Sequence, residues 1–137
     1  MDIANKSKEY HNTETTIYSC QYHIVFCPKY RRSVLKDGVD TRLKELIVEY
    51  GEQCGFDVLE MEIMPDHVHL LLDIPPTKRV RDVVTTLKGF TAHSLRREFK
   101  SLKTRLPSLW TRSSFISSVG TVSLEVVKRY IENQKNK

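Results

Sequence analysis

Two histidines separated by a single residue are the most chemically specific feature of this sequence. His67 and His69 lie in the segment Asp66-His67-Val68-His69. Because side chains alternate across a β-strand, both imidazoles project from one face, about 7 Å apart at the backbone. Neutral imidazole is a common metal ligand, so the pair could hold one cation between the rings. The spacing also fits the alternative, two surface histidines on a half-exposed strand.

A tight hairpin would place a carboxylate beside these histidines. Residues 65–66, Pro-Asp, separate two segments of alternating apolar residues, 58–64 and 67–73. With 65–66 as the turn, Glu62 lies directly opposite His69. Glu62 could therefore orient the imidazoles or supply a further ligand. The alternative is an ordinary charged residue on a solvated strand face.

A tyrosine and a glutamine near the C-terminal end form a second candidate group. Tyr130 and Gln134 are four residues apart, so a helix would present a phenol and an amide oxygen on one face. Taken alone, Tyr130 with Val126 and Val127 is typical of a packing stripe. Beside the histidines it gains a chemical role, because a tyrosine hydroxyl can attack a phosphodiester and become joined to the phosphate.

A divalent cation would assist that attack by polarising the phosphate and orienting the leaving oxygen. Magnesium prefers oxygen donors, whereas imidazole also suits manganese or zinc. Two imidazoles and one amide oxygen therefore do not select the metal.

The apolar pattern predicts the elements that must position these groups. The expected order is β-α-β-β-α-β-α, with strands at 16–26, 58–64, 67–73 and 110–119, and helices starting near Val39, after a cap at Thr77, and at Ser123. The first helix should end at Gly55, and the last should reach about Gln134.

The first six of these elements match the ferredoxin-like, split βαβ arrangement. This is an α+β fold in which an antiparallel sheet carries helices on one face, here with an extra C-terminal helix. We expect residues 1–15 to form a loose tail and residues 16–137 to form a single domain.

Charge and composition narrow the class of protein. The net charge is +5, and the segment from Lys78 to Arg105 carries nine basic and two acidic residues. Such a segment favours a polyanion as the partner, with a solvated helix face as the alternative. Three cysteines without a CxxC pair, no signal region and no membrane-length apolar run indicate a cytoplasmic protein without a membrane partner.

Three stretches of the chain together resemble one family. They are Tyr22 to Arg31 (YHIVFCPKYR), Met64 to Leu71 (MPDHVHLL) and Tyr130 to Gln134 (YIENQ). In order and spacing, from about Thr16 to Gln134, they are similar to the single-tyrosine HUH transposases of the smallest bacterial and archaeal insertion sequences. Val68 is apolar, as the middle position of the family's His-x-His motif requires.

The resemblance implies a concrete reaction. Tyr130 would be the nucleophile that forms a 5′-phosphotyrosine link and leaves a free 3′-hydroxyl. His67, His69 and Gln134 would hold a magnesium or manganese ion. The substrate would be single-stranded DNA with hairpins near the ends of the element. Joining would reverse cleavage, without an external energy source.

The same resemblance implies an assembly and a place in the cell. Family members work as homodimers in which the last helix of one subunit completes the active site of the other. The protein would act in the cytoplasm, associated with the nucleoid, and a domesticated relative would share the same chemistry.

Two other functions stay open at this point. The first is a single-stranded nucleic-acid-binding module without catalysis, since ferredoxin-like sheets often hold nucleic acid on aromatic residues. The second is a metal-dependent phosphodiester hydrolase, in which Glu62 joins His67 and His69 and leaves Tyr130 unused. Stacking on aromatics is available in principle, but we expect each candidate to be a core residue: Tyr30, Phe90, Trp110 and Phe115.

Overall fold

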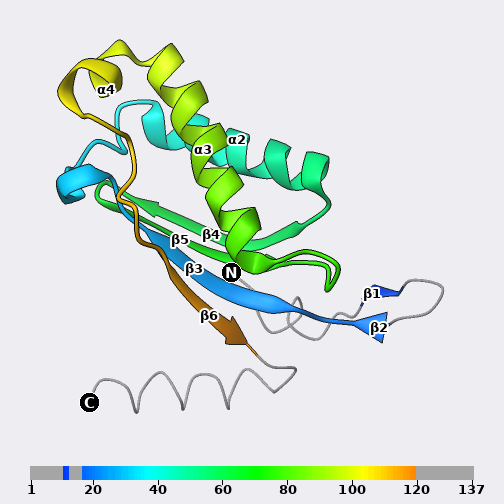
Figure 1. Cartoon of the computed structure of the whole chain (residues 1–137). Coiled ribbons are helices and arrows are strands. Elements are labelled where there is room, and N and C mark those ends of the chain that lie inside the picture. The colour runs from blue at the N-terminus through cyan, green and yellow to red at the C-terminus, as the bar shows by residue number, and fades with distance from the viewer. Residues whose placement is uncertain (1–10, 13–16, 120–137) are drawn as a thin grey trace, which may run out of the picture.

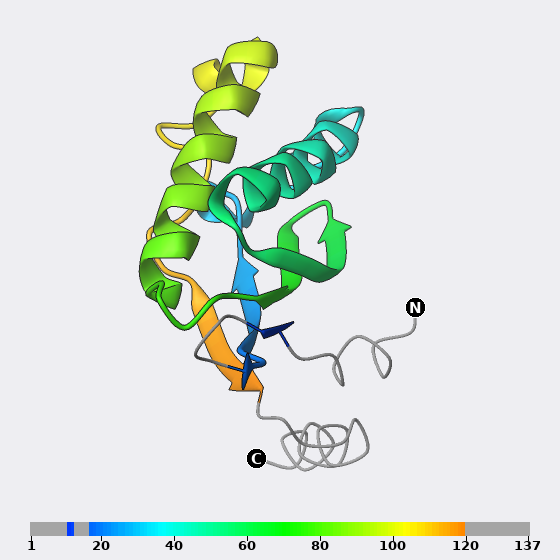
Figure 2. The same ribbon diagram turned by 90° about the vertical axis from the view of Figure 1, so that its right-hand side faces the viewer.

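The computed structural model describes residues 11–12 and 17–119. Its elements are β1 (His11–Asn12), β2 (Ile17–Tyr18), β3 (Gln21–Phe26), the 3-10 turn η1 (Lys29–Arg31), α2 (Val39–Cys54), β4 (Asp57–Met64), β5 (His67–Asp73), α3 (Val80–Glu98), α4 (Lys100–Arg105) and β6 (Phe115–Val119). Strands β3 to β6 form an antiparallel sheet in the order β4-β5-β3-β6, and α2 and α3 cover one face of it (Figures 1 and 2). The predicted α+β class and ferredoxin-like strand order are confirmed.

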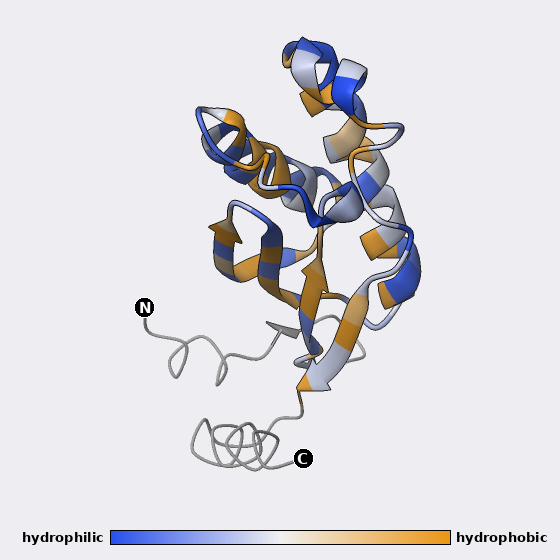
Figure 3. Ribbon diagram, turned by 90° about the vertical axis from the view of Figure 1, so that its left-hand side faces the viewer, coloured by the Kyte–Doolittle hydropathy of each residue, from blue (hydrophilic) through white to orange (hydrophobic). Residues whose placement is uncertain are grey.

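The core lies between the sheet and the two long helices. Hydrophobic and hydrophilic residues alternate along the strands (Figure 3), so each strand turns one apolar face toward the helices. The fully buried side chains come from both layers and include Ile24, Phe26, Val68, Leu70, Leu72, Leu43, Ile47, Leu87 and Leu95. The remaining side chains of β3 and β5 therefore point toward the opposite face of the sheet.

The hairpin of β4 and β5 has the predicted register. Met64 pairs with His67, and Glu62 pairs with His69, across the turn at 65–66. The sequence pattern did not indicate the irregularity between Val58 and Glu60, where β4 shifts its register against β5. The shift lies at the far end of the hairpin from the turn and leaves the pairing around the histidines regular.

The predicted strand at 16–26 is two strands. The break falls at Ser19 and Cys20, where the backbone N–H of Cys20 donates to Asp73 Oδ1 at 3.1 Å. Ile74 N–H in turn donates to the Cys20 carbonyl at 2.8 Å. Because these bonds replace a regular strand ladder, β3 begins only at Gln21. Residues 11–12 of the predicted tail pair with β2 as β1, and the rest of that tail lies outside the described residues.

The start of α3 differs from expectation. Thr77 does not cap the helix, since α3 begins at Val80 after Arg79, without a side-chain cap. The helix ends at Glu98, and the short helix α4 follows at once. Arg96 joins the two, because its Nη2 donates to the carbonyls of Lys103 (3.4 Å) and Leu106 (3.1 Å).

The last predicted strand is shorter than the pattern indicated. β6 covers only Phe115–Val119, whereas Trp110 forms an isolated bridge with Pro28. The indole of Trp110 is buried and donates from Nε1 to Thr91 Oγ1 at 3.1 Å. Thr91 is thus a core residue that polarity alone would assign to the surface. The expected helix from Ser123 lies outside the described residues. No helix in the described part of the chain has the length and apolarity needed to cross a membrane.

Lys88 ties α3 to the segment that leads into β6. Its partly buried ammonium donates to Thr111 O (2.8 Å), Ser113 O (3.1 Å) and Ser114 Oγ (2.9 Å). Burial lowers the pKa of Lys88. Its three hydrogen bonds give Lys88 a structural role.

We expect Lys88→Met to lower the free energy of unfolding by about 1–3 kcal/mol, because three hydrogen bonds from a charged donor are lost while the aliphatic stem is kept. Urea unfolding followed by circular dichroism measures the difference. Lys44→Met, at an exposed position of α2, is the control and should change stability by less than about 0.5 kcal/mol. Equal stability of the two variants would show that the Lys88 bonds contribute nothing net.

Candidate active site

His67 and His69 project from the sheet face opposite the one that α2 and α3 cover. Val68 between them is fully buried in the helix-side core, and both histidines are half-buried. The predicted common face is therefore confirmed. Directly paired residues in an antiparallel sheet point the same way, so Glu62, His69, Val25 and Phe115 form one row across the four strands.

Asp66 holds the ring of His67 in one tautomer. His67 Nδ1 lies 2.9 Å from Asp66 Oδ1, and Arg31 Nε lies 3.1 Å from Asp66 Oδ2. The hydrogen bond from His67, together with the charge of Arg31, lowers the pKa of Asp66, so the carboxylate stays ionised and only accepts. His67 Nδ1 is then the donor, and Nε2 of the neutral ring keeps its lone pair. The sequence reasoning had assigned Asp66 to the turn alone.

A third histidine, from β3, contacts His69. His23 Nδ1 lies 3.0 Å from His69 Nε2, and the two rings stack with centroids 5.2 Å apart and planes 17° apart. Burial, and then the proximity of His69, lower the pKa of His23, which favours its neutral form. The sequence pattern gave no sign of this contact, because it depends on the pairing of β3 with β5.

The hydrogen bond between these rings limits which nitrogen of His69 can bind a cation. If His23 donates, the Nε2 lone pair of His69 is occupied and its Nδ1 carries the proton. If His69 donates from Nε2, its Nδ1 keeps a free lone pair. With the contact intact, only the second arrangement lets His69 act as a ligand.

Two imidazole nitrogens of the described residues could serve as ligands of one metal ion. His67 Nε2 and His69 Nδ1 are imidazole nitrogens of a kind that divalent cations accept. Within residues 11–12 and 17–119, no group of three His, Cys, Asp or Glu side chains could hold a metal ion. Glu62 pairs with His69 but does not complete such a group. The other predicted site residues, Tyr130 and Gln134, lie outside the described residues.

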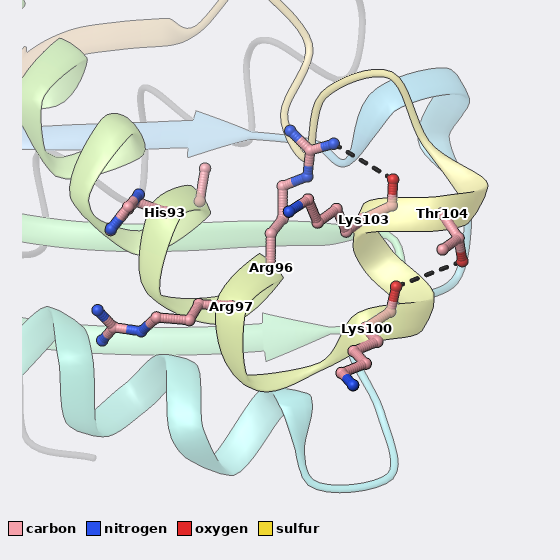
Figure 4. Close-up of a pocket in the computed structure, with 7 residues that line it drawn as sticks. His93, Arg96, Arg97, Lys100, Lys103 and Thr104 are labelled. Carbon is pink, nitrogen blue, oxygen red and sulfur yellow. Dashed lines mark hydrogen bonds between the residues drawn. The ribbon is translucent and has the colours of Figure 1, made fainter.

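A basic cleft lies on the helix side of the molecule. It has a volume of about 540 Å³ and is lined by side chains of α3 and α4: Ala92, His93, Arg96, Arg97, Lys100, Lys103 and Thr104 (Figure 4). Arg97, Lys100 and Lys103 are exposed, and no carboxylate lines the cleft. The basic segment of the sequence thus gathers part of its charge at one place, while Lys88 and Arg96 use their donors inside the fold.

The expectation that all four candidate aromatics are core residues was wrong for two of them. Trp110 is buried, and Phe90 is partly buried and stacks on Tyr50 with ring centroids 4.7 Å apart. Tyr30 and Phe115, however, are 65% and 59% exposed. Both exposed rings are therefore available to an external partner.

Comparison with known proteins places the chain in a family. Residues 16–134 match the family model described as "Transposase IS200 like". The chain is 37% identical over 123 residues to the ISDra2 transposase TnpA of Deinococcus radiodurans, covering 88% of each chain. It is 32% identical over 121 residues to the transposase for insertion sequence element IS200 of Salmonella typhimurium, covering 87% of this chain and 79% of the relative.

Solved structures support the same assignment. A crystal structure from Deinococcus radiodurans, assigned as a transposase, aligns with a TM-score of 0.76 and 33% identity, covering 90% of this chain and 97% of the other. A REP-associated tyrosine transposase bound to a REP hairpin aligns with a TM-score of 0.60, covering 87% of this chain and 68% of the other, but its 14% identity shows the fold alone. The match over 119 consecutive positions, the sequence identities and the shared fold agree, and this chain belongs to the IS200-like transposase family.

Proposed function

We propose that this protein cleaves and rejoins single-stranded DNA at hairpin-bearing ends through a 5′-phosphotyrosine formed by Tyr130. The observation that carries the proposal is the pair of half-buried imidazoles on one sheet face. A neighbouring side chain contacts one nitrogen of each ring. The other nitrogen is free for a cation when Asp66 accepts from His67 and His23 accepts from His69. Membership of the IS200-like family supplies the reaction in which such a pair is needed.

The proposed metal site uses His67 through Nε2, His69 through Nδ1 and Gln134 through its amide oxygen, with magnesium or manganese as the ion. When bound, the cation would withdraw charge from the scissile phosphate and stabilise the charge that develops there. Asp66 keeps the proton of His67 on Nδ1, and His23 accepts the Nε2 proton of His69. The two neighbours thus act by orienting the rings rather than by touching the substrate.

In the proposed cleavage, the phenol oxygen of Tyr130 forms a bond to phosphorus while the bond from phosphorus to the 3′-oxygen breaks. The phenol releases its proton to solvent as it attacks, and the leaving 3′-oxygen takes up a proton and becomes a free hydroxyl. The number of phosphoester bonds does not change, so a 3′-hydroxyl can reverse the step and join DNA.

The basic cleft supports DNA as the partner. Lys and Arg contacts to phosphates supply most of the sequence-independent affinity for nucleic acid. The neighbouring structure of a REP-associated transposase contains a REP hairpin, which favours hairpin DNA for this chain as well. We place the protein on the nucleoid in the cytoplasm, where such DNA is found.

A nucleic-acid-binding module without catalysis is the second candidate, favoured by the exposed rings of Tyr30 and Phe115 and by the presence of a basic cleft. Such a module would have no use for oriented imidazoles. The hydrolase with Glu62 as a third ligand loses support, since Glu62 does not form a metal-binding group with His67 and His69 among the described residues.

Incubation with magnesium and single-stranded DNA that carries hairpin ends should give a protein–DNA adduct that survives denaturation. Tyr130→Phe should abolish the adduct and retain DNA binding, because only the nucleophilic oxygen is removed. Denaturing gel electrophoresis and an anisotropy titration measure the two properties. Cut DNA with a free 5′-phosphate from the Tyr130→Phe protein would instead establish a hydrolase, and binding without any cut product would establish a binding module.

The proposed homodimer shares its active sites, with Tyr130 of one subunit serving the histidines of the other. Mixed dimers of Tyr130→Phe and His67→Ala subunits should therefore regain adduct formation, because one of their two sites is then complete. Each variant alone should be inactive. Differently tagged subunits and tandem purification provide the mixed dimers. Inactivity of these purified dimers would contradict shared sites.

Removing either neighbour of the imidazoles should weaken metal binding. We expect Asp66→Ala and His23→Phe each to lower the affinity for Mn²⁺ about ten-fold or more, since loss of such outer hydrogen bonds typically has this effect. Isothermal titration calorimetry on the full chain measures the affinity without requiring cleavage. Glu62→Gln is the control and should bind Mn²⁺ like the parent protein. An equal loss in Glu62→Gln would identify a carboxylate ligand and contradict the proposed set.

A further inference from the structure

Tyr30 presents an aromatic ring to solvent in the turn η1. It is 65% exposed, more than any other large hydrophobic residue among those that the structure describes. Large aromatic rings usually lie in cores or at interfaces, where their area is removed from water. An exposed ring of this size is therefore more informative than an exposed aliphatic residue.

The backbone under this ring is strained. Tyr30 has φ 58° and ψ 17°, and Arg31 follows with φ 52°, so two consecutive residues other than glycine adopt the left-handed conformation. This region is uncommon for residues with a Cβ atom, and it occurs mostly at single positions. Strained residues of this kind cluster at ligand-binding sites, where the strain fixes a side chain in a required place.

The chain that leads into the turn is anchored to the segment at 109–111. Lys29 N–H donates to Leu109 O at 2.8 Å, and Thr111 N–H donates to Cys27 O at 2.9 Å. Within the turn, Arg31 N–H donates to Pro28 O at 2.8 Å. The segment at 109–111 therefore clamps the turn and keeps the ring of Tyr30 where it is.

Two side-chain contacts connect this turn to the candidate active site. Arg31 Nε lies 3.1 Å from Asp66 Oδ2, and Asp66 Oδ1 lies 2.9 Å from His67 Nδ1. The residue next to Tyr30 is thus two contacts away from an imidazole that we assign to the metal. A DNA strand with a phosphate at the histidines would have its neighbouring nucleotides near η1.

The positive charges around the Tyr30 ring also suit a DNA strand. Lys29 Nζ lies 5.4 Å from the centre of the Tyr30 ring, and Arg31 and Arg32 follow in sequence with no acidic residue between them. Arg32 also lines a cleft together with Arg105 at the end of α4. Positive charge therefore extends from the helix side toward the turn. An aromatic ring beside basic side chains is the combination that binds single strands of nucleic acid, by stacking and by phosphate contact.

We propose that Tyr30 is a stacking platform for one unpaired base of the single-stranded DNA, next to the phosphate that Tyr130 attacks. The inference rests on the proposed function and assigns the substrate a further binding position. The left-handed turn presents the ring, the clamp keeps it in place, and the cations of residues 29–32 hold the phosphates on either side of the stacked base.

The test uses the full-length protein without divalent metal, so that binding is measured apart from cleavage. A series of single-stranded DNAs, each with one abasic position, is titrated by fluorescence anisotropy. The parent protein should lose affinity about ten-fold or more at one position in the single-stranded stretch. Tyr30→Asn should bind intact DNA as weakly as the parent protein binds that abasic DNA. The affinity of Tyr30→Asn should not fall further when the intact DNA is replaced by the abasic DNA. Tyr30→Phe, which keeps the ring, should behave like the parent.

Three controls separate stacking from a structural role. Asparagine tolerates the left-handed conformation, so Tyr30→Asn should unfold at a temperature no lower than the parent protein. Phe115→Leu removes the other highly exposed ring. This variant should still lose affinity for DNA at the same abasic position as the parent protein. Light scattering should give the same oligomeric state for Tyr30→Asn and the parent.

Several results would overturn the proposal. Equal affinity of the parent and Tyr30→Asn for intact DNA, while the parent still cleaves, would refute the platform and leave the proposed function standing. Loss of the abasic effect in Phe115→Leu would assign the stacking to Phe115. Dissociation of Tyr30→Asn dimers would make Tyr30 an interface residue. A parent protein that binds no single-stranded DNA would refute both the platform and the proposed function.

Discussion

The two-residue period of β5 is the constraint on which the candidate site depends. Val68, Leu70 and Leu72 are fully buried against α2 and α3, and burial of each such side chain contributes about 1.5–3 kcal/mol. A slip of one residue would expose all three and turn His67 and His69 into the core. The apolar core between the sheet and the helices thus fixes the face on which the imidazoles stand, although no core residue touches the chemistry.

Neighbouring elements supply the side chains that contact the two histidines of β5. The turn before β5 supplies Asp66 to one ring, and β3 supplies His23 to the other. The contact with Asp66 leaves Nε2 of His67 for a ligand, and the contact with His23 leaves Nδ1 of His69 when His69 is the donor. Arg31 extends the same network to η1, so the orientation of His67 and the position of the strained turn are physically linked.

The basic cleft and the imidazoles lie on different sides of the sheet. The basic cleft of α3 and α4 lies on the helix side, whereas the histidines occupy the other face of the sheet. In the proposed function, one surface supplies affinity through phosphates, and the other positions a single phosphate for attack. Because different elements carry the two tasks, substitutions in the cleft can change affinity without altering the geometry around the histidines.

The sequence by itself determined the features that short-range patterns control. The alternation of β5 and the two-residue turn at 65–66 were enough to place His67 and His69 on one face opposite Glu62, and Gly55 was enough to end α2. Motif spacing also identified Tyr130 and Gln134, which lie outside the described residues, so their roles stay predictions. Only the tertiary structure decided that His23 reaches His69, that Arg31 reaches Asp66, and that Tyr30 is exposed on a strained turn. The physical reason is that these contacts join residues about 35 to 46 positions apart, whose meeting depends on how strands pair and on which segment clamps a turn, and no local periodicity encodes either.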